Sequence, residues 1–113
     1  MYSTGEKGPA NDIAARFVPL FEQYGVHLVL QGAEADYERT FPMRKEEPNS
    51  RGVTYVTLGG GGATPKRRAD SHPSTARFVS NYHFADFKIV DRKLTMKVFN
   101  EQAKQIDKLE LYM

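Results

Sequence analysis

The sequence predicts an α+β fold, in which one helix near the N-terminus packs on a mixed sheet of about five strands that is largely antiparallel in its second half. Apolar residues recur at helical spacing in residues 13–24, β-branched runs follow in 26–30 and 52–58, and apolar and polar residues alternate in 94–98. A chain of 113 residues is long enough for one domain and too short for two. We therefore expect a single domain spanning residues 1–113.

The predicted helix begins at Asn11 or Asp12, which are both suitable N-cap residues. Its apolar face comprises Ile13, Phe17, Leu20, Phe21 and Tyr24. Pro19 lies inside this pattern, and a proline in a helix interior costs about 3 kcal/mol. We therefore expect a kink near Pro19 or a helix that restarts there. Gly25 is expected to end the helix in a left-handed backbone conformation.

Two strands are predicted in the middle of the chain. Residues 26–30 are apolar except for His27, which favours a strand buried on both faces. Residues 32–51 are polar and rich in turn signals, and we expect irregular structure there. Residues 52–58 are rich in Val, Thr and Tyr and predict the second strand. Four glycines follow, and an exposed loop is expected over residues 59–75.

The last third of the chain predicts an antiparallel meander. Strands are expected in residues 81–90 and 94–100, joined by a hairpin turn at 91–93, with a final strand in 108–113. The alternation places Leu94, Met96 and Val98 on one face and Thr95 and Lys97 on the other. This period of two is typical of an antiparallel sheet with one face in water.

Composition and charge exclude several classes of function. The formal net charge is only +2, much of it from the basic triplet at 66–68, and favours neither nucleic acid nor membrane as a partner. There is no cysteine, which excludes disulfides and thiolate metal sites. No signal peptide and no membrane-spanning run are visible, so we expect a soluble protein of undetermined compartment. The histidines, which are His27, His72 and His83, lack ligand spacing and are expected to pack or to lie at the surface.

One segment carries a motif. Residues 24–40 read Tyr-Gly-Val-His-Leu-Val-Leu-Gln-Gly-Ala-Glu-Ala-Asp-Tyr-Glu-Arg-Thr. This segment resembles the calcineurin-like metallophosphoesterases, especially those akin to purple acid phosphatases, in which a buried strand runs into Gly-His-x-His-x-Tyr-Glu-Arg. The matching residues are Gly32, Tyr37, Glu38 and Arg39. Ala33 and Ala35 stand where the motif has histidines.

The rest of the chain resembles the same family in the same order. Residues 53–62 are similar to its next strand and glycine-rich turn, and residues 81–90, 94–98 and 106–111 to its closing strands. Residues 2–5 resemble the loop after an earlier histidine. The resemblance covers nearly the whole chain but only the second half of the family's domain. It implies half of a two-sheet metallophosphoesterase sandwich.

The resemblance also implies a chemistry. These enzymes are metal-dependent phosphoric ester hydrolases that hold two metal ions, such as Fe, Mn or Zn, and activate a bound water. The two histidines of the motif complete the metal cage, and the methyl groups of Ala33 and Ala35 have no lone pair to donate. We therefore predict no catalytic residue, no metal cofactor and no activity for this chain alone. Glu34 and Asp36 are weak candidates for replacement ligands. Arg39 is expected to order the loop through charge-assisted hydrogen bonds.

Three functional readings remain open at this point. The chain is a phosphoesterase-like fragment that is inactive alone, a non-enzymatic self-assembling or protein-interaction module, or a hydrolase completed by another chain. Half of a sandwich leaves an apolar sheet face and an unpaired strand edge exposed. A second copy is the simplest cover, because a two-fold axis uses one self-complementary patch twice. We therefore expect a homo-oligomer built through the exposed sheet edge or face.

Overall fold

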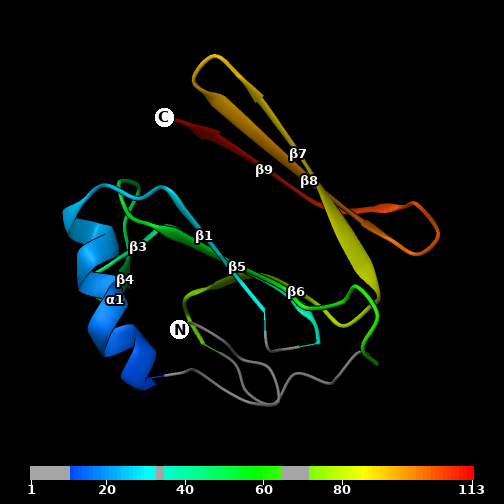
Figure 1. Ribbon diagram of the computed structural model, residues 1–113, viewed down its shortest axis with the longest axis horizontal. Helices are drawn as coiled ribbons and strands as arrows, with labels where there is room; N and C mark the ends of the chain where they lie inside the picture. The colour runs from blue at the N-terminus through cyan, green and yellow to red at the C-terminus, as the bar shows by residue number, and fades with distance from the viewer. Residues whose placement is uncertain (1–10, 33–34, 65–71) are drawn as a thin grey trace.

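The computed structural model describes residues 11–32, 35–64 and 72–113 (Figure 1). The elements in these ranges are α1 (Asn11–Gln23), β1 (Leu28–Gln31), β2 (Tyr37–Thr40), β3 (Met43–Arg44), β4 (Glu47–Pro48), β5 (Thr54–Leu58), β6 (Thr75–Val79), β7 (His83–Val90), β8 (Lys93–Asn100) and β9 (Gln105–Tyr112). This combination confirms the predicted α+β class, although the strands are more numerous than the five expected. No helix in the described part of the chain is long and apolar enough to cross a membrane.

The strands form two main sheets and a small hairpin. Sheet 1 has the order β1-β5-β2-β6, sheet 2 has the order β7-β8-β9, and β3 pairs with β4. β1 runs parallel to β5, whereas the other neighbouring strands are antiparallel. The strands are therefore mixed in direction and largely antiparallel, as the sequence predicts.

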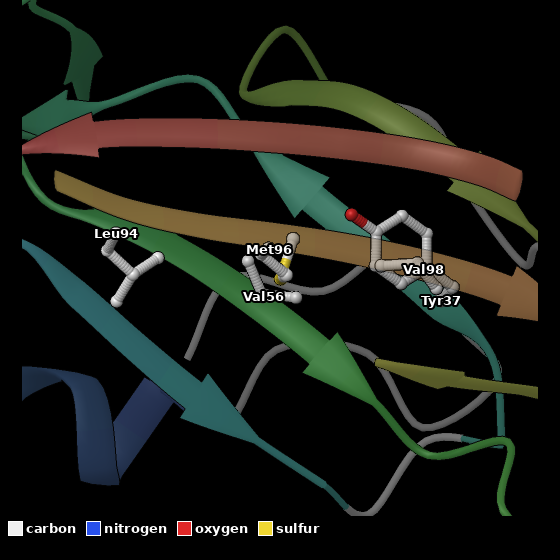
Figure 2. Close-up of a cluster of buried hydrophobic side chains, with 5 residues drawn as sticks. All are labelled: Tyr37, Val56, Leu94, Met96 and Val98. Atoms are coloured by element: carbon white, nitrogen blue, oxygen red, sulfur yellow. The ribbon is translucent and has the colours of Figure 1, made fainter. Parts of the chain in front are cut away.

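The main core lies between the two sheets. Tyr37 and Val56 extend from sheet 1, and three side chains of β8 meet them, namely Leu94, Met96 and Val98. Figure 2 shows these five side chains between the strands of the two sheets. The alternation predicted for β8 is confirmed, because Lys97 between the inner residues is exposed. Sheet 1 and sheet 2 thus form a two-layer sandwich.

The helix covers the opposite face of sheet 1. Tyr55 and Val56 are neighbours on β5, so their side chains point to opposite faces of the sheet. Val56 lies in the core between the sheets, whereas Tyr55 packs in a second buried cluster with Met43 and Val53. The ring of Phe21 from α1 lies 6.5 Å from that of Tyr55. The order of layers is therefore helix, sheet 1 and sheet 2 (Figure 1).

The end of α1 is the one predicted. Gly25 has a φ of 67°, in the left-handed region that glycine adopts without a steric penalty. The N–H of Val26 then donates to the carbonyl of Phe21 at 3.0 Å, a bond typical of a glycine-terminated helix. The helix continues through Pro19 as a single element, so the restart considered above does not occur.

The expectation that residues 26–30 form a strand buried on both faces is wrong. β1 lies at the edge of sheet 1, and among the described residues its ladder partner is β5 alone. Leu30 is 50% exposed. β5 is the strand buried on both faces, because β1 and β2 flank it and α1 and sheet 2 cover it. A short apolar run does not specify which strand takes the central position.

The expected irregular region at 32–51 contains three strands, which are β2, β3 and β4. β2 is also an internal strand of sheet 1, between β5 and β6. Its polar residues escaped the strand prediction because their partners lie far away in sequence. β6 falls partly in the predicted loop, and β9 begins at Gln105, three residues earlier than expected.

Sheet 1 covers only part of the inner face of sheet 2. Phe87 and Ile89 of β7 lie directly across the ladder from Met96 and Leu94 of β8, so they share the inner face. Met96 and Leu94 are 0% and 9% exposed, whereas Phe87 and Ile89 are 37% and 62% exposed. Figure 1 shows the β7–β8 hairpin projecting past sheet 1. We call Phe87 and Ile89 the overhang patch.

Candidate functional site

The motif residues lie at one end of sheet 1. Gly32 follows β1 and is exposed, and Ala35 precedes β2 in a bend and is half-buried. Three further motif residues, Tyr37, Glu38 and Arg39, form most of β2 rather than a loop. Ala33 and Glu34 lie outside the described residues.

Two of these side chains bind the same carboxylate on sheet 2. Tyr37 and Arg39 are two residues apart on β2, so both point toward sheet 2. The Tyr37 hydroxyl donates to Oδ2 of Asp107 on β9. Nε of Arg39 donates to the same oxygen at 2.7 Å, and its Nη2 donates to Oδ1 at 3.2 Å. Asp107 therefore joins the two sheets through three hydrogen bonds, one of them from a tyrosine.

Burial and charge together set the protonation of this cluster. Burial alone raises the pKa of Asp107, but the hydrogen bonds from Arg39 and Tyr37 outweigh it and hold that pKa below its ordinary value of 3.8. Burial, followed by the hydrogen bond to Asp107, raises the pKa of the Tyr37 hydroxyl well above its ordinary value of 10.0. The cluster consequently holds a neutral tyrosine, a cationic arginine and an anionic aspartate around neutral pH.

Glu38 points to the other face of β2. Its side chain is buried, and Oε2 accepts a hydrogen bond from the Thr75 hydroxyl on β6 at 2.7 Å. This bond ties β2 to the edge strand β6. The charge-assisted hydrogen bonds expected for Arg39 are present, but they join two sheets through Asp107 instead of ordering a loop.

His83 packs against the same cluster. Its buried ring meets the Tyr37 ring edge-on, with the ring centres 5.5 Å apart. Nδ1 lies 2.9 Å from the carbonyl oxygen of Asn81, so Nδ1 carries the proton and donates. A Cβ placed on Gly60 would lie 2.2 Å from Nδ1 of His83, so the glycine at this position allows the ring to approach the chain closely. His83 thus has the packing role expected of a histidine without ligand spacing.

The described residues offer few donors to a metal ion. Within 11–32, 35–64 and 72–113, no three or more His, Asp or Glu side chains gather closely enough to hold one. Asp36 is buried next to the motif, and its backbone carbonyl accepts a hydrogen bond from the N–H of Gly59 at 3.1 Å. Its fellow candidate Glu34 falls outside the described ranges. Ala35 contributes only a methyl group.

Asp107 is the functional partner that sequence reasoning missed. A signal for it exists, because Asp107, Leu109 and Leu111 alternate along β9 on the inner face of sheet 2. A carboxylate on an otherwise apolar face requires a charged or hydrogen-bonding partner. The pattern therefore points to a partner for Asp107 but does not identify Arg39.

Comparison with known proteins shows the fold of this arrangement. No family model and no curated protein matches the sequence. The structure of GAP50, the anchor in the inner membrane complex of Plasmodium, matches with a TM-score of 0.83 and 18% identity over 99% of this chain. Purple acid phosphatase PPD1 from yellow lupin (Lupinus luteus) seeds matches with a TM-score of 0.76 and 21% identity over 82% of this chain.

These two similarities establish a metallophosphoesterase-like fold. The chain spans 33% of the length of the GAP50 chain and 19% of the length of the phosphatase chain. At these identities the likeness concerns the fold alone.

Proposed function

We propose that this chain is a non-catalytic module with a metallophosphoesterase-like fold, acting as a structural or interaction unit. One observation carries the proposal. The retained motif residues Tyr37 and Arg39 bind Asp107 and join two sheets, a role that needs no metal or substrate. The positions at which the family resemblance implies metal ligands are Ala33 and Ala35. The motif therefore keeps its structural residues and lacks its ligands.

The chemistry of the donors supports inactivity. A two-metal hydrolase needs several oxygen or nitrogen ligands around ions that lie about 3.5–4 Å apart. An alanine side chain supplies none, and the described residues contain no cluster of three donor side chains. The residues present therefore do not fit the metal pair that the resemblance implies.

Turnover of an aryl phosphate tests this proposal. Purified protein is assayed with added Mn²⁺, Fe²⁺ or Zn²⁺, with and without a chelator, and we expect no chelator-sensitive hydrolysis. The double variant Ala33→His/Ala35→His is expected to bind Zn²⁺ in calorimetry more tightly than the unmodified chain, because imidazole nitrogens are good zinc ligands. Metal-dependent hydrolysis by the unmodified chain would contradict the proposal and favour a hydrolase completed by another chain.

A second copy of the chain is the partner we propose for the overhang patch. Phe87 and Ile89 continue the apolar inner face of sheet 2 but are exposed, unlike Met96 and Leu94 across the ladder. Contact between two such patches about a two-fold axis would bury each of them with a single type of interface. This arrangement supports a self-assembling module.

Light scattering with size-exclusion chromatography measures the molar mass and tests self-assembly. We expect a dimer that dissociates in the variant Ile89→Lys. Val90→Lys is the matched control, because Val90 is exposed on the opposite face of the same strand. A monomer at all concentrations, or equal effects of both variants, would contradict assembly through the overhang patch.

A further inference from the structure

A small cavity lies at the end of sheet 1 that is remote from the motif. It has a volume of about 110 Å³, and its lining includes Glu22, His27, Arg44 and Arg51. We call it the arginine pocket. A cavity needs only about 10–15 Å³ to hold one water, so this one has room for several waters or a small anion.

The parallel pairing of β1 and β5 separates this pocket from the motif. His27 directly precedes β1 and Gly52 lies just before β5, whereas Gly32 and Gly59 follow the same two strands. The starts of parallel strands meet at one end of a sheet and their ends at the other. The arginine pocket is therefore a separate site from the one that resembles a phosphoesterase centre.

A close backbone contact brings the two arginines to one cavity. Met43 and Val53 exchange two backbone hydrogen bonds of 2.8 Å, which places Arg44 next to the segment that carries Arg51. A Cβ on Gly52 would lie 2.4 Å from the carbonyl oxygen of Met43, so the approach requires glycine. The pocket is thus a product of the packing of β3 against the start of β5.

Two further contacts fix the walls of the pocket. The side-chain oxygen of Asn49 accepts a hydrogen bond from the backbone N–H of Arg51 at 2.9 Å. On the other side, Oε1 of Glu22 accepts the backbone N–H of Lys45 at 3.0 Å and ties the β3–β4 turn to α1. Figure 1 shows β3 and β4 beside α1. Both arginine-bearing segments are therefore held by side-chain hydrogen bonds to the backbone.

The β3–β4 turn is also strained. Lys45 and Glu46 have φ values of 51° and 65°, and neither residue is glycine. A left-handed conformation costs a non-glycine residue roughly 1–2 kcal/mol. These two residues form the two-residue loop of the β3–β4 hairpin, in which a type I′ turn requires positive φ at both positions. The turn directly follows Arg44, which lines the pocket.

The charges of the lining favour an anion. Arg44 and Arg51 are both exposed, and in the described parts of the chain neither forms an ion pair. Glu47, which lies opposite Arg44 in the β3–β4 ladder, is not in an ion pair there either. The opposing carboxylate in the lining is Glu22. Arginine side chains are suited to the oxygens of a phosphate-type anion, and two arginines line this cavity.

We propose that the arginine pocket binds a phosphate group through Arg44 and Arg51, with His27 as a further hydrogen-bonding wall. With Glu22 in the same lining, the two arginines leave a net charge of +1, which favours an anion, and a phosphate group offers more oxygens to two arginines than a carboxylate does. The competing explanation is that the arginines offset the partial negative charge at the C-terminal end of α1. That explanation predicts an effect on stability without any effect on anion binding.

Titration with inorganic phosphate, followed by NMR of the backbone amides at constant ionic strength, tests the site. We expect saturable shifts at Arg44, Arg51 and Gly52. The double variant Arg44→Ala/Arg51→Ala should weaken binding about tenfold or more, since a hydrogen bond to a charged group contributes about 1.5–3 kcal/mol. Glu22→Gln should strengthen binding. Arg92→Ala, in the exposed turn between β7 and β8, is the matched control and should not change binding.

Further ligands distinguish the source of the phosphate group. Saturable binding of phenyl phosphate as well as inorganic phosphate would assign the site to phosphate esters, and binding of inorganic phosphate alone would assign it to the free ion. Acetate should bind more weakly than either. Equal shifts with chloride, or unchanged phosphate binding in Arg44→Ala/Arg51→Ala, would overturn the proposal.

Discussion

The guanidinium of Arg39 and the carboxylate of Asp107 form a two-point ion pair between residues that are 68 positions apart in the chain. Arg39 belongs to β2 in sheet 1 and Asp107 to β9 in sheet 2. The pair is mostly buried, with side-chain exposures of 20% and 10%. Together with the hydrogen bond from the Tyr37 hydroxyl, it adds directional contacts beside the apolar core between the two sheets.

Removal of Arg39 should destabilise the fold. Arg39→Ala leaves the carboxylate of Asp107 without its cation, and we expect a loss of about 2–3 kcal/mol in the free energy of unfolding. Removal of one partner from a fully buried ion pair costs about 3–5 kcal/mol, and the expected loss is smaller here because solvent reaches both side chains. Arg39→Lys should recover only part of the loss, since an ammonium group lacks the planar two-point geometry. Urea denaturation measures both, and an unchanged midpoint for Arg39→Ala would contradict the structural role.

The same pair predicts an acid-sensitive stability. Because the pKa of Asp107 is lower in the folded chain than its ordinary value of 3.8, its stabilising contribution is present above that value. The contribution is lost as the pH falls through the lower pKa of the folded state. Asp107→Asn should therefore lower the free energy of unfolding most near neutral pH. The difference in this free energy between the variant and the unmodified protein should shrink below about pH 4. Denaturation at a series of pH values measures this difference, and a value that stays constant down to about pH 2 would contradict the stabilising role of the Asp107 carboxylate.

Gly60 and Gly61 form a matched pair for testing the contact with His83. A Cβ at Gly60 would lie 2.2 Å from Nδ1 of His83 and 2.8 Å from the carbonyl oxygen of Asn81, whereas one at Gly61 would meet no atom within 4 Å. Gly60→Ala should lower the unfolding free energy by about 1–3 kcal/mol through overpacking. Gly61→Ala should leave it unchanged or raise it by up to about 1 kcal/mol. Equal melting temperatures for the two variants would refute the close contact.

Leu94 and Ile89 test how far the core extends. They lie directly opposite each other on the inner face of sheet 2, but Leu94 is 9% exposed and Ile89 is 62% exposed. Leu94→Ala should cost about 2–5 kcal/mol in unfolding free energy at any protein concentration. Ile89→Ala should cost less than about 1 kcal/mol in dilute protein. If the overhang patch is an interface, the cost of Ile89→Ala should grow with protein concentration in thermal denaturation.

The local patterns of the sequence determined several features of the fold. The α+β class, the glycine-terminated helix and the β7–β8 hairpin follow from residue spacing and turn residues, which act over a few positions. The apolar alternation of Leu94, Met96 and Val98 also identified the inner face of sheet 2 correctly. These features are predictable because neighbouring residues suffice to specify them.

The tertiary structure decided which strand lies where and what each polar side chain binds. It placed β5 rather than β1 between two neighbours, and it made a central strand of the polar segment Tyr37–Thr40. It also brought Asp107 to Arg39, and Arg51 to the cavity beside Arg44. Each of these relationships joins residues that are separated along the chain, so no local pattern records them. For the strand order and for the pair of Arg39 and Asp107, the physical cause is the requirement that buried backbone groups and charges find partners when the layers pack.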